Sequence, residues 1–117
     1  MKFAEVKDQP AVLVIALEPH VFGGVQAVEF TTRIREFVEQ GKRGFIVDLS
    51  SVEVMNSSGL GMLVSSLTTV RKFGAELVLA AVPEKIQRLL VITHLDRVFQ
   101  QFPSVEEALK YFSQQEQ

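Results

Sequence analysis

The residues with the clearest potential for chemistry are two adjacent serines, Ser57 and Ser58, which stand between Asn56 and Gly59. Asparagine and serine side chains accept hydrogen bonds from the free amides of a helix start, and this run precedes apolar residues at helical spacing. The plainest interpretation is therefore a capped helix start. Such a start also carries about half a positive charge and unpaired N–H groups. A phosphate attached to a serine hydroxyl at this turn would be well placed.

Two glycines in the same turn, Gly59 and Gly61, add a second signal. Each weakens a helix by roughly 1 kcal/mol relative to alanine. Their presence predicts that another group approaches the backbone closely at this point, and it leaves room for a partner.

A serine nucleophile would need a positioned base, and the sequence offers little support for one. The first glycine of a Gly-x-Ser-x-Gly elbow is absent before Ser57. The only histidines, His20 and His94, fall in an expected loop and near an expected helix end, where we interpret them as surface or capping residues. Two scattered histidines without cysteine also make a poor zinc site. The sequence thus predicts no catalytic residue, no metal site, no cofactor and no enzymatic activity.

Alternating strands and helices must hold this turn. Apolar runs and turn residues predict strands at 2–6, 11–17, 44–49, 76–82 and 97–102, with a turn at 7–10. Helical spacing predicts helices at 25–40, from the serine turn to Gly74, from Pro83 to Thr93, and from a capping box at Ser104 onward. This order predicts an α/β fold with a mixed, largely parallel central sheet of about 4–5 strands and about 4 helices.

The helix after the serines has an apolar stripe and an unusually small, polar opposite face. The stripe is Leu60, Leu63, Val64, Leu67 and Val70, and the polar face is Gly61, Ser65, Ser66, Thr68 and Thr69. This low, uncharged surface is either a contact for another protein or an ordinary solvated face. We expect contact near the Ser57 end.

Composition describes one compact domain over residues 1–117. A hydrophobic content of 47% is enough for a core, and a net charge of -2 gives no electrostatic reason to bind nucleic acid. The longest early apolar run, residues 11–17, is far shorter than the roughly 20 residues that span a bilayer. The absence of cysteine agrees with a reducing compartment. We expect a cytoplasmic protein without membrane insertion.

Residues 47–61, reading VDLSSVEVMNSSGLG, and residues 74–79, reading GAELVL, resemble the STAS domain of bacterial anti-sigma factor antagonists. The resemblance covers nearly the whole chain. It implies a STAS fold. In that family the serine directly after a loop Asp is usually phosphorylated, and the matching residue here is Ser57, with Ser58 as the second choice. The resemblance also implies the partners: an anti-sigma factor that is a serine protein kinase of the histidine-kinase-like ATPase type, and a serine phosphatase.

The chain departs from the family pattern at two places. Asn56 stands where the family usually has Asp, which removes a carboxylate beside the hydroxyl. The loop before the first helix lacks the usual Asp, and its nearest carboxylate is Glu18, followed by the aromatic Phe22. The expected partner-binding residues are Asn56, Ser57, Ser58, Gly59, Gly61, Ser65, Glu18 and Phe22.

Two other functions remain open from the sequence. The chain could be a STAS scaffold or regulatory subunit that is never phosphorylated, as the change to Asn56 would suggest. It could also be a regulatory subunit that binds a small ligand, such as a nucleotide or a lipid.

Overall fold

The structure is a computed structural model that describes residues 1–115. Its main sheet has the order β1-β2-β4-β6-β7, in which β1 is antiparallel to β2 and the other neighbours are parallel. These strands are β1 Lys2–Val6, β2 Gln9–Ala16, β4 Gly44–Asp48, β6 Glu76–Ala80 and β7 Gln101–Phe102. A separate parallel pair joins β3 His20–Val21 to β5 Val54–Met55. The helices are α1 Val25–Glu39, α2 Ser57–Lys72, α3 Glu84–Ile92 and α4 Val105–Gln115. The predicted fold class is confirmed.

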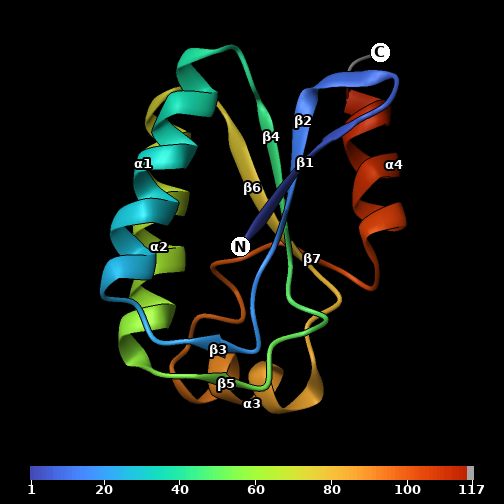
Figure 1. The fold of residues 1–117 in the computed structure, drawn as a ribbon. Helices are drawn as coiled ribbons and strands as arrows, with labels where there is room; N and C mark the ends of the chain where they lie inside the picture. Colours follow the sequence, from blue (N-terminus) through green and yellow to red (C-terminus); the bar gives the residue numbers. More distant parts are fainter. Residues whose placement is uncertain (116–117) are drawn as a thin grey trace.

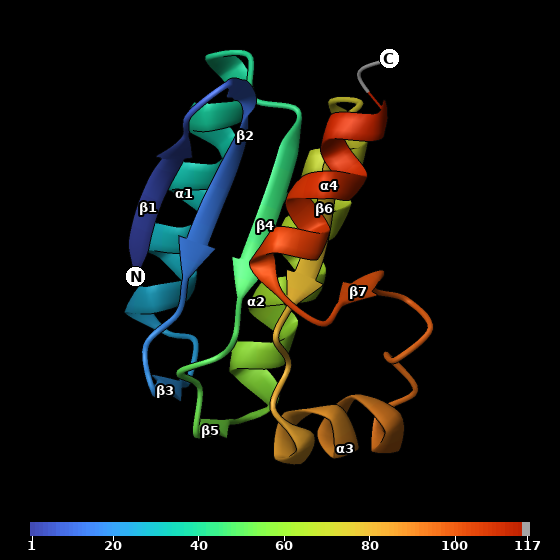
Figure 2. The ribbon, with the colours of Figure 1, turned by 90° about the vertical axis from the view of Figure 1, so that its right-hand side faces the viewer.

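The helices form layers on both faces of the sheet. Helices α1 and α2 lie side by side on one face, α4 covers the other, and α3 lies below the carboxyl ends of the strands (Figure 1). Figure 2 shows α4 running along β4 and β6. Every helix in residues 1–115 is too short or too polar to cross a bilayer.

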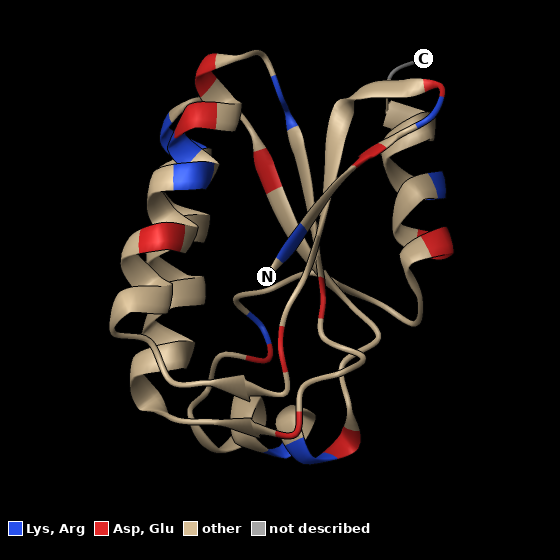
Figure 3. Cartoon of the chain, in the orientation of Figure 1, with Lys and Arg blue, Asp and Glu red and all other residues tan. Residues whose placement is uncertain are grey.

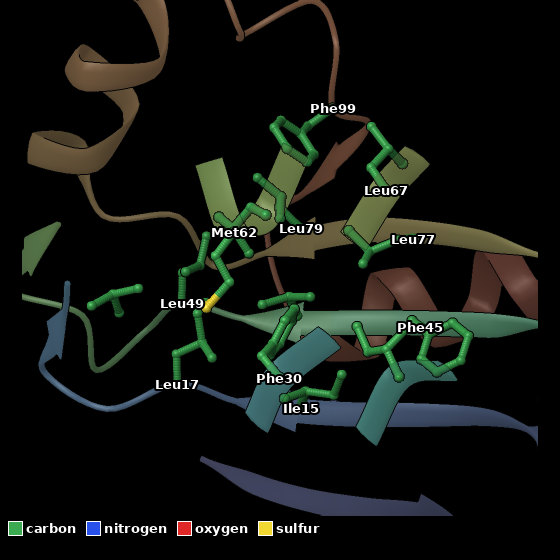
Figure 4. Close-up of a cluster of buried hydrophobic side chains, with 14 of the residues drawn as sticks. Ile15, Leu17, Phe30, Phe45, Leu49, Met62, Leu67, Leu77, Leu79 and Phe99 are labelled. Carbon is green, nitrogen blue, oxygen red and sulfur yellow. The ribbon is translucent and has the colours of Figure 1, made fainter. Parts of the chain in front are cut away.

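Two apolar cores hold these layers together. The larger core lies between the sheet and α1 and α2, and Figure 4 shows Phe30, Leu49 and Met62 meeting inside it. The smaller core packs Ala108 and Phe112 of α4 against the opposite face of the sheet. Leu60, in the first turn of α2, belongs to the larger core, so the core anchors this turn.

Several expected boundaries were wrong in detail. Pro10 was expected in a turn but lies in β2, and the strand expected at 97–102 is reduced to Gln101–Phe102. Residues before β7 instead form a loop that buries Phe99. The short pair β3 and β5 was not predicted, because two-residue strands carry no readable periodicity.

Ser66 requires a correction. It was expected on the polar face of α2, but Ser66 is 0% exposed. Its hydroxyl has no hydrogen-bond partner among the described residues. The physical reason is that α2 packs against α1 as well as against the sheet. Its buried arc is consequently wider than one stripe and also includes Met62.

The start of α4 and the end of α3 lie where they were expected, but the capping box expected at α4 is incomplete. Ser104 caps α4, because its Oγ accepts a hydrogen bond from the Glu107 N–H at 3.1 Å. The Glu107 carboxylate does not close a capping box but lies 3.4 Å from Lys110 Nζ. His94 follows the end of α3 in a left-handed conformation with φ 62°, and its side chain is exposed, as expected for a surface residue.

A buried lysine ties the β1–β2 hairpin to the rest of the sheet. Lys42 donates hydrogen bonds from Nζ to Glu5 Oε1 at 2.6 Å and to the Pro10 carbonyl at 2.7 Å. The Lys42 ammonium, through this hydrogen bond and its charge, lowers the pKa of the Glu5 carboxyl from its ordinary value of 4.5.

We therefore predict an acid-dependent contribution of Glu5 to stability. A lowered folded pKa stabilises the protein above the unfolded value near 4.5, and this contribution is lost as the pH falls through the folded pKa. Chemical unfolding at pH 7 should show Glu5→Gln less stable than the native chain, and unfolding at pH 3 should show a smaller difference. An equal difference at both pH values would contradict the ionic role of Glu5.

Candidate functional site

Asn56 is the cap of α2 and defines the site. Its backbone is extended, and its side-chain Oδ1 accepts a hydrogen bond from the Gly59 N–H at 2.8 Å. Its carbonyl accepts the first helical bond, from Leu60 N–H at 3.0 Å. An asparagine at this position stabilises the helix start without adding a negative charge.

Ser57 and Ser58 are the first two residues of α2, and both are exposed. Their backbone amides belong to the first helical turn, and no hydrogen-bond acceptor in residues 1–115 pairs with them. The first turn contains no acidic residue, and the helix carries basic Arg71 and Lys72 only at its far end. Two free N–H groups and the positive end of the helix dipole thus lie beside two accessible hydroxyls.

Gly59 is a packing residue of the site. An added Cβ would lie 2.2 Å from the Val21 carbonyl oxygen, so the backbone of β3 occupies the space that a side chain would need. The close approach predicted from the glycines is therefore made by the chain itself. Gly61 differs, because nothing lies within 4 Å of its Cβ position and the residue is exposed.

The loop between β3 and α1 is fastened to the same turn. The Asn56 N–H donates to the Val21 carbonyl at 3.3 Å. Gly23, with φ +77°, packs so closely on Ser58 that an added Cβ would lie 2.7 Å from Ser58 Cβ. The structure therefore brings the loop that contains Phe22 against the serine turn.

Gln26, which sequence reasoning missed, sets the shape of this loop. Its Oε1 accepts from the Phe22 N–H at 2.9 Å, and its Nε2 donates to the His20 carbonyl at 3.0 Å and to Glu18 at 3.5 Å. Glu18 also pairs with the amino group of Met1, so its carboxylate supports the loop. The only sequence signal for this role was a glutamine side chain in the first turn of a helix, just after the glycine pair at 23 and 24.

The Phe22 side chain is presented to solvent by this loop. It is 47% exposed and stacks on His20 with ring centroids 5.5 Å apart. The expected partner-binding residue Phe22 is thus accessible, in contrast to the buried Gly59.

A shallow hollow of about 400 Å³ lies between α1 and α2 beside the serines. Its lining includes Gly24, Ala27, Val28, Ser58, Gly61 and Ser65. Figure 3 shows that the first turns of both helices carry no Lys, Arg, Asp or Glu. The expected residues Ser58, Gly61 and Ser65 therefore meet on one uncharged surface.

The described residues contain no group of three histidine or acidic side chains that could hold a metal ion. The chemistry available at the turn is that of exposed hydroxyls at a helix start.

Comparison with known proteins adds an independent finding. A family model described as "STAS domain" matches residues 3–108. The Thermotoga neapolitana homologue of the anti-sigma factor antagonist TM1081 is 35% identical over 75 residues, which are 64% of this chain and 66% of that protein, just under two thirds of its length. The anti-sigma-B factor antagonist of Staphylococcus aureus is 33% identical over 94 residues, covering 80% of this chain and 78% of that protein.

The fold also matches the solved structures of SpoIIAA, an anti-sigma factor antagonist from Bacillus. Its unphosphorylated form has a TM-score of 0.77 and covers 96% of each chain. Its phosphorylated form has a TM-score of 0.71, covering 95% of this chain and 99% of that one. Sequence identity is 16% in both, so this likeness concerns the fold alone.

The two glycines provide a matched pair of substitutions. We predict that Gly59→Ala destabilises the protein by roughly 2 kcal/mol or more, because the new Cβ collides with the Val21 carbonyl. Gly61→Ala, in the same helix but in open space, should stabilise it by up to about 1 kcal/mol. Urea unfolding of both variants measures the difference. Equal effects would show that β3 does not pack on α2 as described.

The cap residue gives a second prediction. Asn56→Ala should lower the free energy of unfolding by about 1 kcal/mol, because the Gly59 N–H loses its acceptor. Asn56→Asp keeps an acceptor and should stay within about 0.5 kcal/mol of the native chain. Thermal and urea unfolding measure both. A native-like Asn56→Ala would mean that the cap contributes nothing.

Proposed function

The chain belongs to the STAS domain family, and from this premise we propose that it is a regulatory binding module of the anti-sigma factor antagonist type, switched by phosphorylation of Ser57. The observation that carries the proposal is the exposed pair of hydroxyls at a helix start with free amides. We assign Ser57 first and Ser58 second.

The proposed reaction places the new bond on the serine oxygen. Ser57 Oγ bonds to the γ-phosphorus of ATP, the bond between that phosphorus and the bridging oxygen breaks, and ADP leaves. The hydroxyl proton goes to a base on the kinase, because Asn56 supplies an amide in place of a carboxylate. This chain acts as the acceptor and contributes no catalytic group.

The start of α2 can accommodate a phosphoserine at position 57 as well as the unmodified serine. A phosphoserine carries about -1.5 to -2 charges, and its oxygens accept hydrogen bonds from helix-start amides. No acidic residue in the first turn of α2 opposes that charge. We therefore expect the phosphorylated domain to keep its fold.

The same phosphate opposes a docked partner. At an interface it must be desolvated or set against partner carboxylates, which costs several kcal/mol and corresponds to roughly a hundredfold or more in affinity. Phosphorylation would thus release the partner while leaving the domain intact.

The proposed partners follow from the relatives. The anti-sigma-B factor antagonist of Staphylococcus aureus is named for opposing an anti-sigma factor. We propose the corresponding partner here, an anti-sigma factor that is also a histidine-kinase-like serine kinase, with a serine phosphatase to reset the switch. The proposal includes a single STAS domain over 1–117 that works in the cytoplasm and binds neither nucleic acid nor membrane.

A second candidate function rests on Asn56. An amide beside the acceptor hydroxyl also fits a STAS scaffold that binds its partner permanently and has lost the phosphorylation reaction. The two functions differ in whether the native chain accepts phosphate.

The test is phosphate transfer from Mg-ATP by each purified histidine-kinase-like anti-sigma factor of the source organism, followed by intact-mass and peptide mass spectrometry. The substrates are the native chain and its Ser57→Ala, Ser58→Ala and Asn56→Asp variants. We predict one phosphate on the native chain and on Ser58→Ala, and none on Ser57→Ala.

The other outcomes are equally informative. Phosphate on Asn56→Asp but not on the native chain would replace the switch with the scaffold function. Loss of phosphate only in Ser58→Ala would show that Ser58, and not Ser57, is the phosphorylated residue. No phosphate on any variant would overturn the switch.

A further inference from the structure

Helix α3 turns apolar side chains toward solvent as well as toward the core. Ile86 and Leu90 are buried, as an amphipathic helix requires. Val91 and Ile92, however, are 50% and 75% exposed, and Val54 of the neighbouring β5 is 38% exposed. Contiguous exposed apolar side chains on a small domain mark an interaction surface more often than isolated ones do.

The shape of this surface suits a protein. One hollow of about 300 Å³ lies between β5 and α3 and is lined by Val54, Met55, Leu89 and Ile92. A second of similar volume lies along the outer side of α3, beside Val91 and Ile92. Ile92 therefore forms a ridge with a hollow on either side, into which side chains of a partner can insert.

The rim of the surface contains a cation without an ion-pair partner. Lys85 and Arg88 line the hollow between β5 and α3. Arg88 pairs with Glu84 at 2.8 Å, whereas Lys85 has no carboxylate at ion-pair distance among residues 1–115. Glu53, which is exposed and adjoins Val54, is a second carboxylate beside this surface, so the distinctive charge of the surface is the unpaired ammonium of Lys85. A complementary partner segment is apolar and carries an acidic side chain.

The surface lies close to Ser57. Val54 precedes Ser57 by three residues, which span at most about 11 Å. A standard interface buries roughly 800 Å² on each partner, equivalent to a disc about 16 Å in radius. Figures 1 and 2 both place β5 directly beside α3 at the end of the molecule where α2 begins. A protein that covers Ser57 thus reaches β5 and the start of this surface.

We propose that Val54, Leu89, Val91, Ile92 and the rim residue Lys85, here called the α3 patch, form a second docking surface for the protein that phosphorylates or binds Ser57. The occupant is an apolar segment of that protein with an acidic residue facing Lys85. This inference rests on the proposed function and adds the part of the interface that phosphorylation does not touch. The Ser57 contact switches affinity, and the α3 patch supplies affinity that is independent of phosphate.

The experiment measures the dissociation constant by isothermal titration calorimetry with each purified histidine-kinase-like anti-sigma factor of the source organism. The chains compared are native, Ile92→Glu, Lys85→Glu and Lys85→Arg, with Phe73→Glu as the control. Phe73 is 46% exposed but lies at the opposite end of α2. Melting temperatures within about 2 °C of native would show that each variant is folded.

We expect Ile92→Glu to weaken binding at least tenfold and Lys85→Glu to weaken it severalfold. Lys85→Arg and Phe73→Glu should remain within twofold of the native chain. Native affinity in Ile92→Glu would overturn the α3 patch while the proposed function stands. Equal losses in Ile92→Glu and Phe73→Glu would overturn it too. Failure of the native chain to bind any anti-sigma factor would overturn the proposed function and the patch together.

Discussion

The site depends on one backbone contact, the packing of the Val21 carbonyl against Gly59. The same oxygen accepts the hydrogen bond from Asn56 N–H, so β3 holds both the cap and the first turn of α2. Only glycine leaves room for this arrangement, since a Cβ would lie 2.2 Å from the oxygen. The contact fixes the position of the serine hydroxyls relative to the loop that carries Phe22.

The second constraint is the electrostatic environment of the first turn of α2. An uncharged cap, an uncharged first turn and unpaired amides leave the positive end of the α2 dipole open. Uncharged and apolar side chains dominate the two hollows nearest the turn, and Lys85 and Arg88 stand at the rim of one of them. In the function that we propose, a neutral hydroxyl at this turn is compatible with a docked protein, and a phosphate is expected to weaken docking while the contacts inside the domain are kept.

The order of strands and helices and the helix start at Asn56 could be predicted from sequence, because capping residues and apolar periodicity are local signals. The role of Gly59 could be predicted only in part. Two glycines indicated a close approach, but only the tertiary fold shows that Val21 makes it at one glycine and that Gly61 faces open space. The sequence predicts Ser66 to be exposed because it is polar, whereas α2 is buried on two sides and encloses this residue. The role of Gln26 could not be predicted, because its hydrogen bonds to the backbone of His20 and Phe22 depend on the path of a loop that no local sequence pattern encodes.

We propose that the charge on Ser57 controls binding. The most direct measurement is the dissociation constant of the anti-sigma factor for this chain with and without a phosphate on Ser57, determined by calorimetry at one salt concentration. We expect phosphorylation to weaken binding by roughly a hundredfold or more, while the melting temperature stays close to that of the unmodified chain. Equal affinities for the two forms would contradict it.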